Sequence, residues 1–227
     1  MRYKGVLLDI DNTLYDYDTA HKAALDAAAG HVSAQCGVGA NALARAYMAA
    51  RAQVGSELAG TAAAHNRLLY FQLAFEMLGL NPMKHALGTY EAYWGAFLDN
   101  MTLYPDALLF LGSVRDREVC LVTDLTAHIQ HRKALRLGLQ EYAGHIATSE
   151  EAGRDKPHPA IFALALKKTG LKADEVCMVG DSFEKDIAGA AAAGIDSFWM
   201  NRDGQAVRPG VRTTVVSSFT ELMGQLS

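Results

Sequence analysis

The sequence predicts an α/β fold in which a parallel β-sheet core is interrupted by an all-helical insertion. Short runs of apolar and β-branched residues alternate with helical patterns along the second half of the chain, as they do in βαβ units. A long segment rich in Ala and Leu separates the first of these runs from the second and contains no convincing strand. These two observations predict the fold class.

Five short runs are predicted to be the strands of the core, and helical patterns separate the last four of them. The runs are Val6–Asp9, Val119–Thr123, His145–Thr148, Val176–Gly180 and Ser197–Met200. The segment Ser182–Ala193 is predicted to be a helix that ends at Gly194, because glycine readily adopts the left-handed conformation that follows many helices.

The insertion is predicted to be a small helical domain that covers residues 16–103. Glycine and proline breaks at residues 37–39, 55–60 and 81–82 divide it into roughly four helices. The sequence Leu103–Asp106 then returns the chain to the core. We therefore expect two domains, a catalytic core made of residues 1–15 with 104–227, and the helical insertion.

The composition is that of a globular protein with a slightly acidic balance. Of the 227 residues 50% are hydrophobic, and 21 Lys and Arg against 25 Asp and Glu give a net charge of −4. This balance argues against nucleic acid polymers and anionic membranes as partners. No apolar run reaches the roughly 18 residues of a membrane span, and Asp9 interrupts the N-terminal apolar run, so a cytoplasmic protein is expected. The three cysteines form no Cys-x-x-Cys pair and are expected to be inert.

Acidic residues gather at the predicted carboxyl ends of two strands, where an open parallel sheet binds its ligands. Asp9 and Asp11 end the first run, and Gly180 and Asp181 end the fourth, with Asp186 five residues later. Unpaired carboxylates at a buried strand end repel one another, which favours a bound cation, a substrate or a shared proton. Caps and turns are the alternative role for each acid taken alone, and Asp186 also suits the first turn of a helix.

A hydroxyl and an ammonium group lie between these acidic motifs. Thr123 ends the second predicted strand, and Lys156 lies in the loop before a helical segment. Both residue types suit phosphate oxygens, because threonine donates a hydrogen bond and lysine supplies a compact positive charge. Taken singly, Thr123 is better explained as a helix cap and Lys156 as a solvated loop residue.

The order of these motifs resembles that of the haloacid dehalogenase-like superfamily. The four motifs match Asp9–Thr13, Thr123, Lys156 and Gly180–Asp186, and residues 16–103 match the position of the helical cap of that superfamily. The resemblance covers nearly the whole chain. It implies a Rossmann-like core with a helical C1-type cap, and within the superfamily it points to the branch of pyrimidine 5′-nucleotidases and sugar-phosphate phosphatases.

A carboxylate such as Asp9 can attack a phosphoryl group and form an aspartyl-phosphate, since it is ionised at neutral pH without a base. Asp11 would protonate the leaving group and then deprotonate the hydrolytic water. Thr123 and Lys156 would hold the phosphoryl group and offset its charge. The all-oxygen ligand set favours Mg²⁺. The resemblance implies that Asp9 and Asp181 bind it by side chain, Asp11 by its backbone carbonyl and Asp186 through water.

The expected substrate is a small phosphomonoester, with a nucleoside monophosphate favoured. A sugar-phosphate phosphatase or phosphosugar mutase stays open as an alternative. A 2-haloacid dehalogenase is a further alternative, although halide displacement needs no acid at Asp11, and a phosphate sensor or scaffold without turnover is the non-enzymatic one. Asp124 departs from the family pattern, in which Asn commonly follows the threonine. The sequence indicates neither the role of Asp124 nor an oligomeric state.

Overall fold

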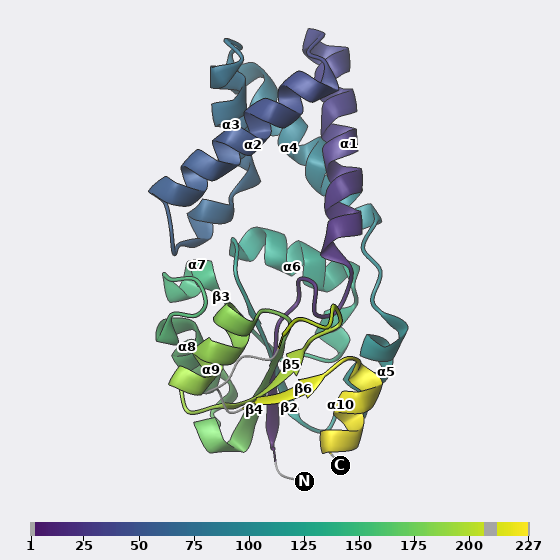
Figure 1. Cartoon of the computed structure of the whole chain (residues 1–227), viewed down its shortest axis with the longest axis vertical. Helices are drawn as coiled ribbons and strands as arrows, with labels where there is room; N and C mark the ends of the chain where they lie inside the picture. The colour runs from purple at the N-terminus through teal and green to yellow at the C-terminus, as the bar shows by residue number, and fades with distance from the viewer. Residues whose placement is uncertain (1–2, 207–212, 227) are drawn as a thin grey trace. The chain divides into compact units, whose positions relative to one another are not determined.

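The computed structural model describes residues 3–206 and 213–226, and the chain forms two compact units (Figure 1). The first unit comprises Met1–Asp16 and Thr102–Ser227 and contains the β-sheet. The second unit, Tyr17–Met101, is helical. Among the helices that the structure describes, none is both long enough and apolar enough to cross a lipid bilayer.

The sheet of the first unit is parallel throughout and has the strand order β3-β2-β1-β4-β5-β6. Its strands are β1 (Gly5–Leu8), β2 (Glu118–Thr123), β3 (His145–Thr148), β4 (Val176–Gly180), β5 (Asp196–Met200) and β6 (Thr213–Val216). The predicted α/β class is confirmed. β1 lies at the centre, and its residues Val6, Leu7 and Leu8 are fully buried, because both faces of the sheet are covered.

Two predictions about the strands need correction. The first strand ends at Leu8, so Asp9 lies just beyond it, although its backbone N–H still donates to the carbonyl of Val179 on β4 at 3.0 Å. The sixth strand, β6, was not among the predicted runs. It is a four-residue edge strand with the sequence Thr-Thr-Val-Val. Its β-branched residues are typical of strands and were the feature that could have predicted it.

Helices pack on the sheet and on one another in the first unit. They are α5 (Pro105–Ser113), α6 (Ala127–Arg136), α7 (Ser149–Ala152), α8 (Pro159–Thr169), α9 (Ala188–Ala192) and α10 (Phe219–Leu226). α8 packs against β2 and β3, while α5 packs against α10 through stacked rings of Phe110 and Phe219. These contacts fix the frame from which the loops at the carboxyl ends of the strands extend.

The predicted helix Ser182–Ala193 is interrupted near its start. A π-helical turn, η4 (Phe183–Ile187), comes first, and α9 follows it. Gly194 has φ +74°, the left-handed conformation expected after the helix. The wide turn arises because the N–H groups of both Asp186 and Ile187 donate to the carbonyl of Ser182. Such turns are frequent at functional sites.

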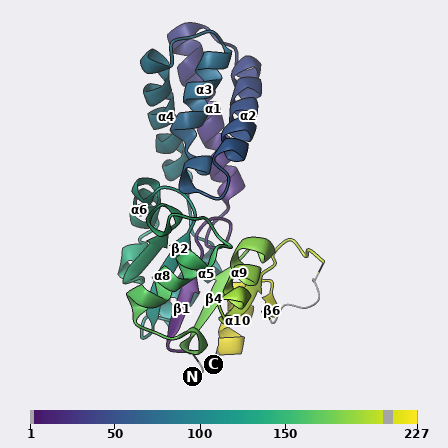
Figure 2. The same ribbon diagram turned by 90° about the vertical axis from the view of Figure 1, so that its left-hand side faces the viewer.

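The second unit contains α1 (Tyr17–Cys36), α2 (Ala40–Glu57), α3 (Arg67–Met77) and α4 (Pro82–Asp99), which run side by side in Figure 2. α1 packs along α4, and α3 packs against both α2 and α4. Asn66 and Asn81 begin α3 and α4, and each side chain accepts a hydrogen bond from a backbone N–H of the first turn. The predicted break at residues 55–60 begins too early, because α2 continues through Gly55 to Glu57.

Candidate active site

The sequence-predicted site residues lie on loops and strand ends at the carboxyl edge of the sheet. Asp9 follows β1, Thr123 ends β2 and Asp181 follows β4, and β2, β1 and β4 are neighbours in the sheet. Parallel strands carry their carboxyl ends to one edge, and this brings residues that are far apart in sequence into contact.

Lys156 bridges two acids of this edge. Its Nζ donates to Oδ1 of Asp9 at 2.6 Å, to Oδ1 of Asp186 at 2.7 Å and to the backbone carbonyl of Val122 at 3.0 Å. All three side chains of this group are almost fully buried. An ion pair in this environment is fixed in position, because neither partner can exchange its contact for water.

Thr13 joins Asp9 to the loop after β4. Its hydroxyl donates to Oδ2 of Asp9 at 2.8 Å and accepts the backbone N–H of Asp181 at 3.1 Å. The carboxylate of Asp9 therefore has one oxygen on Lys156 and the other on Thr13. Thr13 was quoted in the first motif but received no role from the sequence.

Burial, together with the crowding of negative charge, raises the pKa values of two of these acids. Burial raises the pKa of Asp9 well above its usual range, and the charges of Asp186, Asp181 and Asp11 add to this, with Lys156 acting in the opposite direction. Burial and the charge of Asp186 raise the pKa of Asp181 to about 7. Lys156 stays protonated, since Asp186, Asp9 and Asp124 hold its pKa well above the usual value in spite of burial.

Gly180 allows Asp186 to approach the end of β4. A Cβ atom at position 180 would lie 2.4 Å from both Cγ and Oδ2 of Asp186. The same Oδ2 accepts the backbone N–H of Ser182 at 3.0 Å. The glycine and the π-helical turn η4 together place the Asp186 carboxylate beside Lys156.

Asp11 has partners that the sequence did not suggest. Nζ of Lys133, on α6, lies 2.7 Å from each of the two carboxylate oxygens, and the hydroxyl of Tyr15 donates to Oδ1. The Lys133 side chain is only 1% exposed, whereas that of Asp11 is 32% exposed. The feature of the sequence that could have predicted a buried role for Lys133 was its position on the same face of α6 as the apolar Ile129 and Ala134.

Asp124, which directly follows Thr123, fixes the loop that carries Lys156. The Asp124 carboxylate accepts the backbone N–H of Lys156 and the ammonium of Lys185, each at 2.8 Å, and its carbonyl accepts the amide of Gln130. Asp124 thus holds the Lys156 loop. Thr123 is buried at the end of β2, and its hydroxyl makes one long contact, 3.4 Å, with the carbonyl of Asp124.

The acids of this edge fit a divalent cation. Asp9, Asp181 and Asp186 each offer a carboxylate oxygen, and these atoms lie within 4.8 Å of one another. Within the described part of the chain, no lysine or arginine pairs with Asp181, so its charge is not offset by an ion pair. Oxygen ligands that repel one another suit a hard ion such as Mg²⁺.

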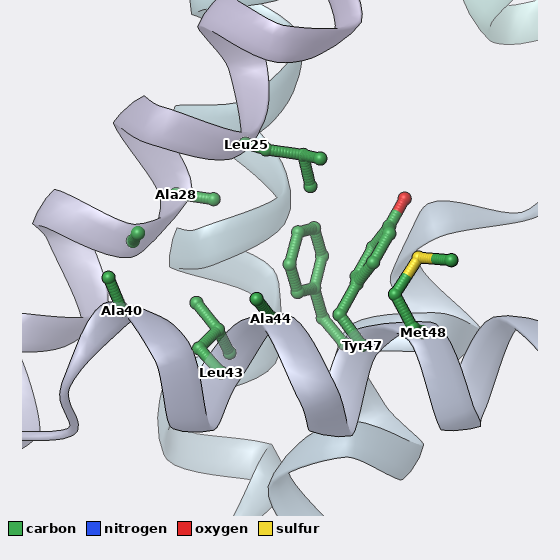
Figure 3. A pocket seen from close by; sticks show the side chains of 9 residues that line it. Leu25, Ala28, Ala40, Leu43, Ala44, Tyr47 and Met48 are labelled. Carbon is green, nitrogen blue, oxygen red and sulfur yellow. The ribbon is translucent and has the colours of Figure 1, made fainter.

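A separate pocket in the helical unit is apolar. It lies between α1 and α2 and has a volume of about 70 Å³ (Figure 3). Its lining residues are Leu25, Ala28, Ala29, Ala40, Leu43, Ala44, Tyr47, Met48 and Phe71. It is smaller than ordinary ligand pockets, which range from about 300 to 1,000 Å³, and it offers little to a phosphate group.

Comparison with known proteins places this geometry in a family. The chain is 40% identical over 198 residues to a ribulose-1,5-bisphosphate 5-phosphatase of Halopiger xanaduensis, which covers 85% of this chain and 82% of that relative. It is 33% identical over 135 residues to pyrimidine 5′-nucleotidase YjjG of Escherichia coli, covering 58% of this chain and 60% of that protein. The crystal structure of a phosphatase from Thermococcus onnurineus has the same fold, with a TM-score of 0.79, 23% identity and coverage of 99% and 98% of the two chains.

A family model described as haloacid dehalogenase-like hydrolase matches residues 3–194. This range includes Asp9, Thr123, Lys156, Asp181 and Asp186, and it extends over most of the chain. The chain belongs to the haloacid dehalogenase-like hydrolases.

Proposed function

We propose that the protein is a Mg²⁺-dependent phosphatase that hydrolyses a small phosphomonoester through an aspartyl-phosphate on Asp9. The observation that carries this proposal is the buried Asp9 carboxylate, which Lys156 and Thr13 hold beside two further acids. A nucleophile that is fixed in this way loses little freedom on reaching the transition state.

The first step transfers the phosphoryl group to Asp9. An oxygen of Asp9 attacks phosphorus, the ester bond breaks, and the departing alkoxide takes a proton from Asp11. In the second step Asp11 takes a proton from water, whose oxygen attacks phosphorus and releases phosphate from Asp9. One residue acts as acid and then as base, a role that contributes about 10²–10⁴-fold to the rate.

The remaining residues bind and orient. Asp9, Asp181 and Asp186, with the backbone carbonyl of Asp11, would hold Mg²⁺, which when bound offsets the charge of the phosphate and of the acids. Lys156 would also offset the negative charge of the phosphate, and the Thr123 hydroxyl would donate to a phosphate oxygen. We also propose that residues 16–103 are the helical cap domain of the protein.

A phosphorylated sugar is our first candidate substrate. The relative with that substrate class in its name covers more of the chain, at higher identity, than the nucleotidase does. A nucleoside monophosphate is the second candidate, and the similarity to pyrimidine 5′-nucleotidase YjjG supports it. The acid at Asp11 disfavours a dehalogenase, because halide leaves carbon without a proton.

The test is phosphate release from sugar phosphates, nucleoside monophosphates and an aryl phosphate, with Mg²⁺ and with a chelator. We expect metal-dependent turnover with the highest kcat/KM for a sugar phosphate, and loss of turnover in Asp9→Asn. Replacing Asp9 removes a repelled buried charge, so this variant should retain its fold. The exposed Asp116, replaced by Asn, is the matched control. Halide release from a 2-haloacid without metal would contradict the proposal, as would binding of phosphate esters without turnover.

A further inference from the structure

The carboxylate of Asp124 lies between two hydrogen-bond donors. Its Oδ1 accepts the backbone N–H of Lys156, and its Oδ2 accepts the ammonium of Lys185, each at 2.8 Å. The Asp124 side chain is only 13% exposed, so water competes little for these oxygens. A carboxylate has the two acceptor oxygens that two donors need, whereas the amide of an asparagine has one acceptor and one donor. The contacts therefore require an acid at position 124.

Lys185 and Asp186, which are consecutive residues of η4, pair with opposite charges on neighbouring loops. Asp186 accepts the ammonium of Lys156 at 2.7 Å, while Lys185 donates to Asp124 at 2.8 Å. Exchanging the partners would place two ammonium groups together and two carboxylates together, which Coulomb repulsion opposes. The two pairs therefore fix how η4 lies against the loop that carries Lys156.

The main chain around Asp124 is fixed as well. The fully buried Gln130 donates its side-chain amide to the Asp124 carbonyl at 2.6 Å. Leu125 has φ +100°, a costly conformation for a residue with a side chain, and its N–H donates to Oγ of Ser149 at 3.0 Å. A strained conformation of this kind persists only where the surrounding contacts determine it. The Asp124 carboxylate therefore extends from a fixed turn and can hold the Lys156 loop against that turn.

An unbalanced carboxylate at position 124 would weaken the binding of phosphate. Asp124 directly follows Thr123 and contacts the main chain of Lys156, and both neighbours are assigned to the phosphoryl group in the proposed function. A phosphate ester carries a charge of about −1.5 to −2 near neutral pH, so a further negative charge beside it is repulsive. The ammonium of Lys185 offsets this charge. Because the Lys185 side chain is 41% exposed, it can be replaced without opening a cavity in the core.

We propose that Asp124 and Lys185 are positioning residues that act together on Lys156. Asp124 fixes the main chain of Lys156, while Lys185 balances the charge of Asp124 and ties it to the turn that carries Asp186. Neither of the two acts on the phosphoryl group directly. The inference rests on the function proposed above, because it concerns the lysine that offsets the charge of the phosphate.

The test is a double-mutant cycle, measured with an aryl phosphate and Mg²⁺. We expect Lys185→Gln to raise KM and the inhibition constant of inorganic phosphate about tenfold, with a smaller change in kcat, because the Asp124 charge is then unbalanced. Asp124→Asn should lower kcat/KM about tenfold, since one of the two donors loses its acceptor. In the double variant the two side-chain amides can hydrogen-bond to each other. Its kcat/KM should lie within about threefold of the wild type, whereas independent effects would multiply to a loss of about a hundredfold.

Two controls separate this role from a contribution to the fold. Lys185→Arg keeps the charge and should keep KM near the wild-type value. Lys4 and Glu175 form a matched ion pair, 2.6 Å long, before β1 and β4, at the opposite edge of the sheet. The same cycle with Lys4→Gln and Glu175→Gln should leave KM unchanged. The free energy of unfolding is measured for every variant.

A loss of stability in Lys185→Gln with an unchanged KM would overturn the positioning role and leave the phosphatase proposal standing. A double variant that shows the product of the two single losses would do the same. Failure of the wild type to hydrolyse any phosphate ester would instead overturn the proposed function. If Asp124→Asn does not fold, Lys185→Gln and Lys185→Arg decide the question: a KM raised in the first alone supports the pair, and an equal KM in both overturns it.

Discussion

Lys133 is a buried lysine that holds the carboxylate of Asp11. Its ammonium contacts both oxygens of Asp11, and Tyr15 contacts one of them. A carboxylate that transfers protons must keep one orientation while the substrate reacts. We therefore interpret Lys133 as a positioning residue for Asp11, acting through that side chain rather than on the phosphoryl group.

Replacing Lys133 by Met should affect substrates according to their leaving groups. An alkyl phosphate needs a proton from Asp11 as its alcohol departs, so we expect kcat/KM to fall by about 10²-fold. An aryl phosphate with an acidic phenol needs less protonation and should lose far less. The measurement is kcat/KM for a series of esters, plotted against the pKa of the leaving group.

The matched control is Arg136→Met, on the exposed side of the same helix. This variant should keep the wild-type dependence on the leaving group. An equal loss for alkyl and aryl esters in Lys133→Met would show that Lys133 serves the fold alone.

Among the elements, the loop from β4 into η4 positions Asp186. Gly180 has no Cβ, and the space that a Cβ would fill is occupied by the Asp186 carboxyl group. Since Asp186 is one of two acids on Lys156, the conformation of this loop also determines where Lys156 lies.

We expect Gly180→Ala to displace Asp186. A Cβ 2.4 Å from Cγ cannot be accommodated without movement, and overpacking of this kind destabilises proteins by about 1–3 kcal/mol. Activity should fall as well, because Lys156 loses a partner. The measurements are the free energy of unfolding and kcat/KM. Gly112→Ala, in α5, is the control, since a Cβ there would meet no atom within 4 Å. Normal activity in Gly180→Ala would contradict this account of the loop.

Sequence reasoning found the sheet but not every element of it. β1, β2 and β4 are buried on both faces and read as continuous apolar runs, so their pattern is strong. β6 is short and lies at the edge, where the pattern is weak. The π-helical turn was not predictable from local pattern, because its hydrogen bonds form around the contact between Asp186 and Gly180.

The residues of the candidate site were also only partly predictable from the sequence. Asp9, Thr123, Lys156 and Asp181 could be selected because strand ends and charge are visible in a sequence. Thr13 and Lys133 act through contacts across 168 and 122 positions, and no local signal reports such distances.

For the molecule as a whole, we expect the acidic edge to couple metal binding to stability. The pKa of Asp181 in the fold, about 7, lies above the ordinary value near 4. The fold therefore favours the protonated form of this buried carboxyl. The contribution of the protonated carboxyl to the free energy of unfolding is fully present below the ordinary pKa, and it is lost as the pH rises through about 7. A divalent cation binds the ionised form and should reverse this loss.

We expect Mg²⁺ to raise the melting temperature, and to do so more at about pH 8 than at about pH 5.5. At roughly ten times its Kd the ion adds about 1.4 kcal/mol to the free energy of unfolding. Thermal unfolding with MgCl₂ or a chelator at matched ionic strength measures this. Asp181→Asn should show a much smaller shift. A shift that is independent of pH, or that is unchanged in Asp181→Asn, would contradict the proposed ligand set.

The most direct test of the account is to trap the phosphorylated enzyme. Asp11→Asn should slow the attack of water more than the transfer to Asp9, so an aryl phosphate with a good leaving group should load the enzyme with phosphate. After acid quenching and peptic digestion, we expect mass spectrometry to find one phosphoryl group on the peptide that contains Asp9, with fragmentation placing it on that residue. Turnover of the wild type combined with phosphate on another residue, or with no phosphorylated peptide under single-turnover conditions, would contradict it.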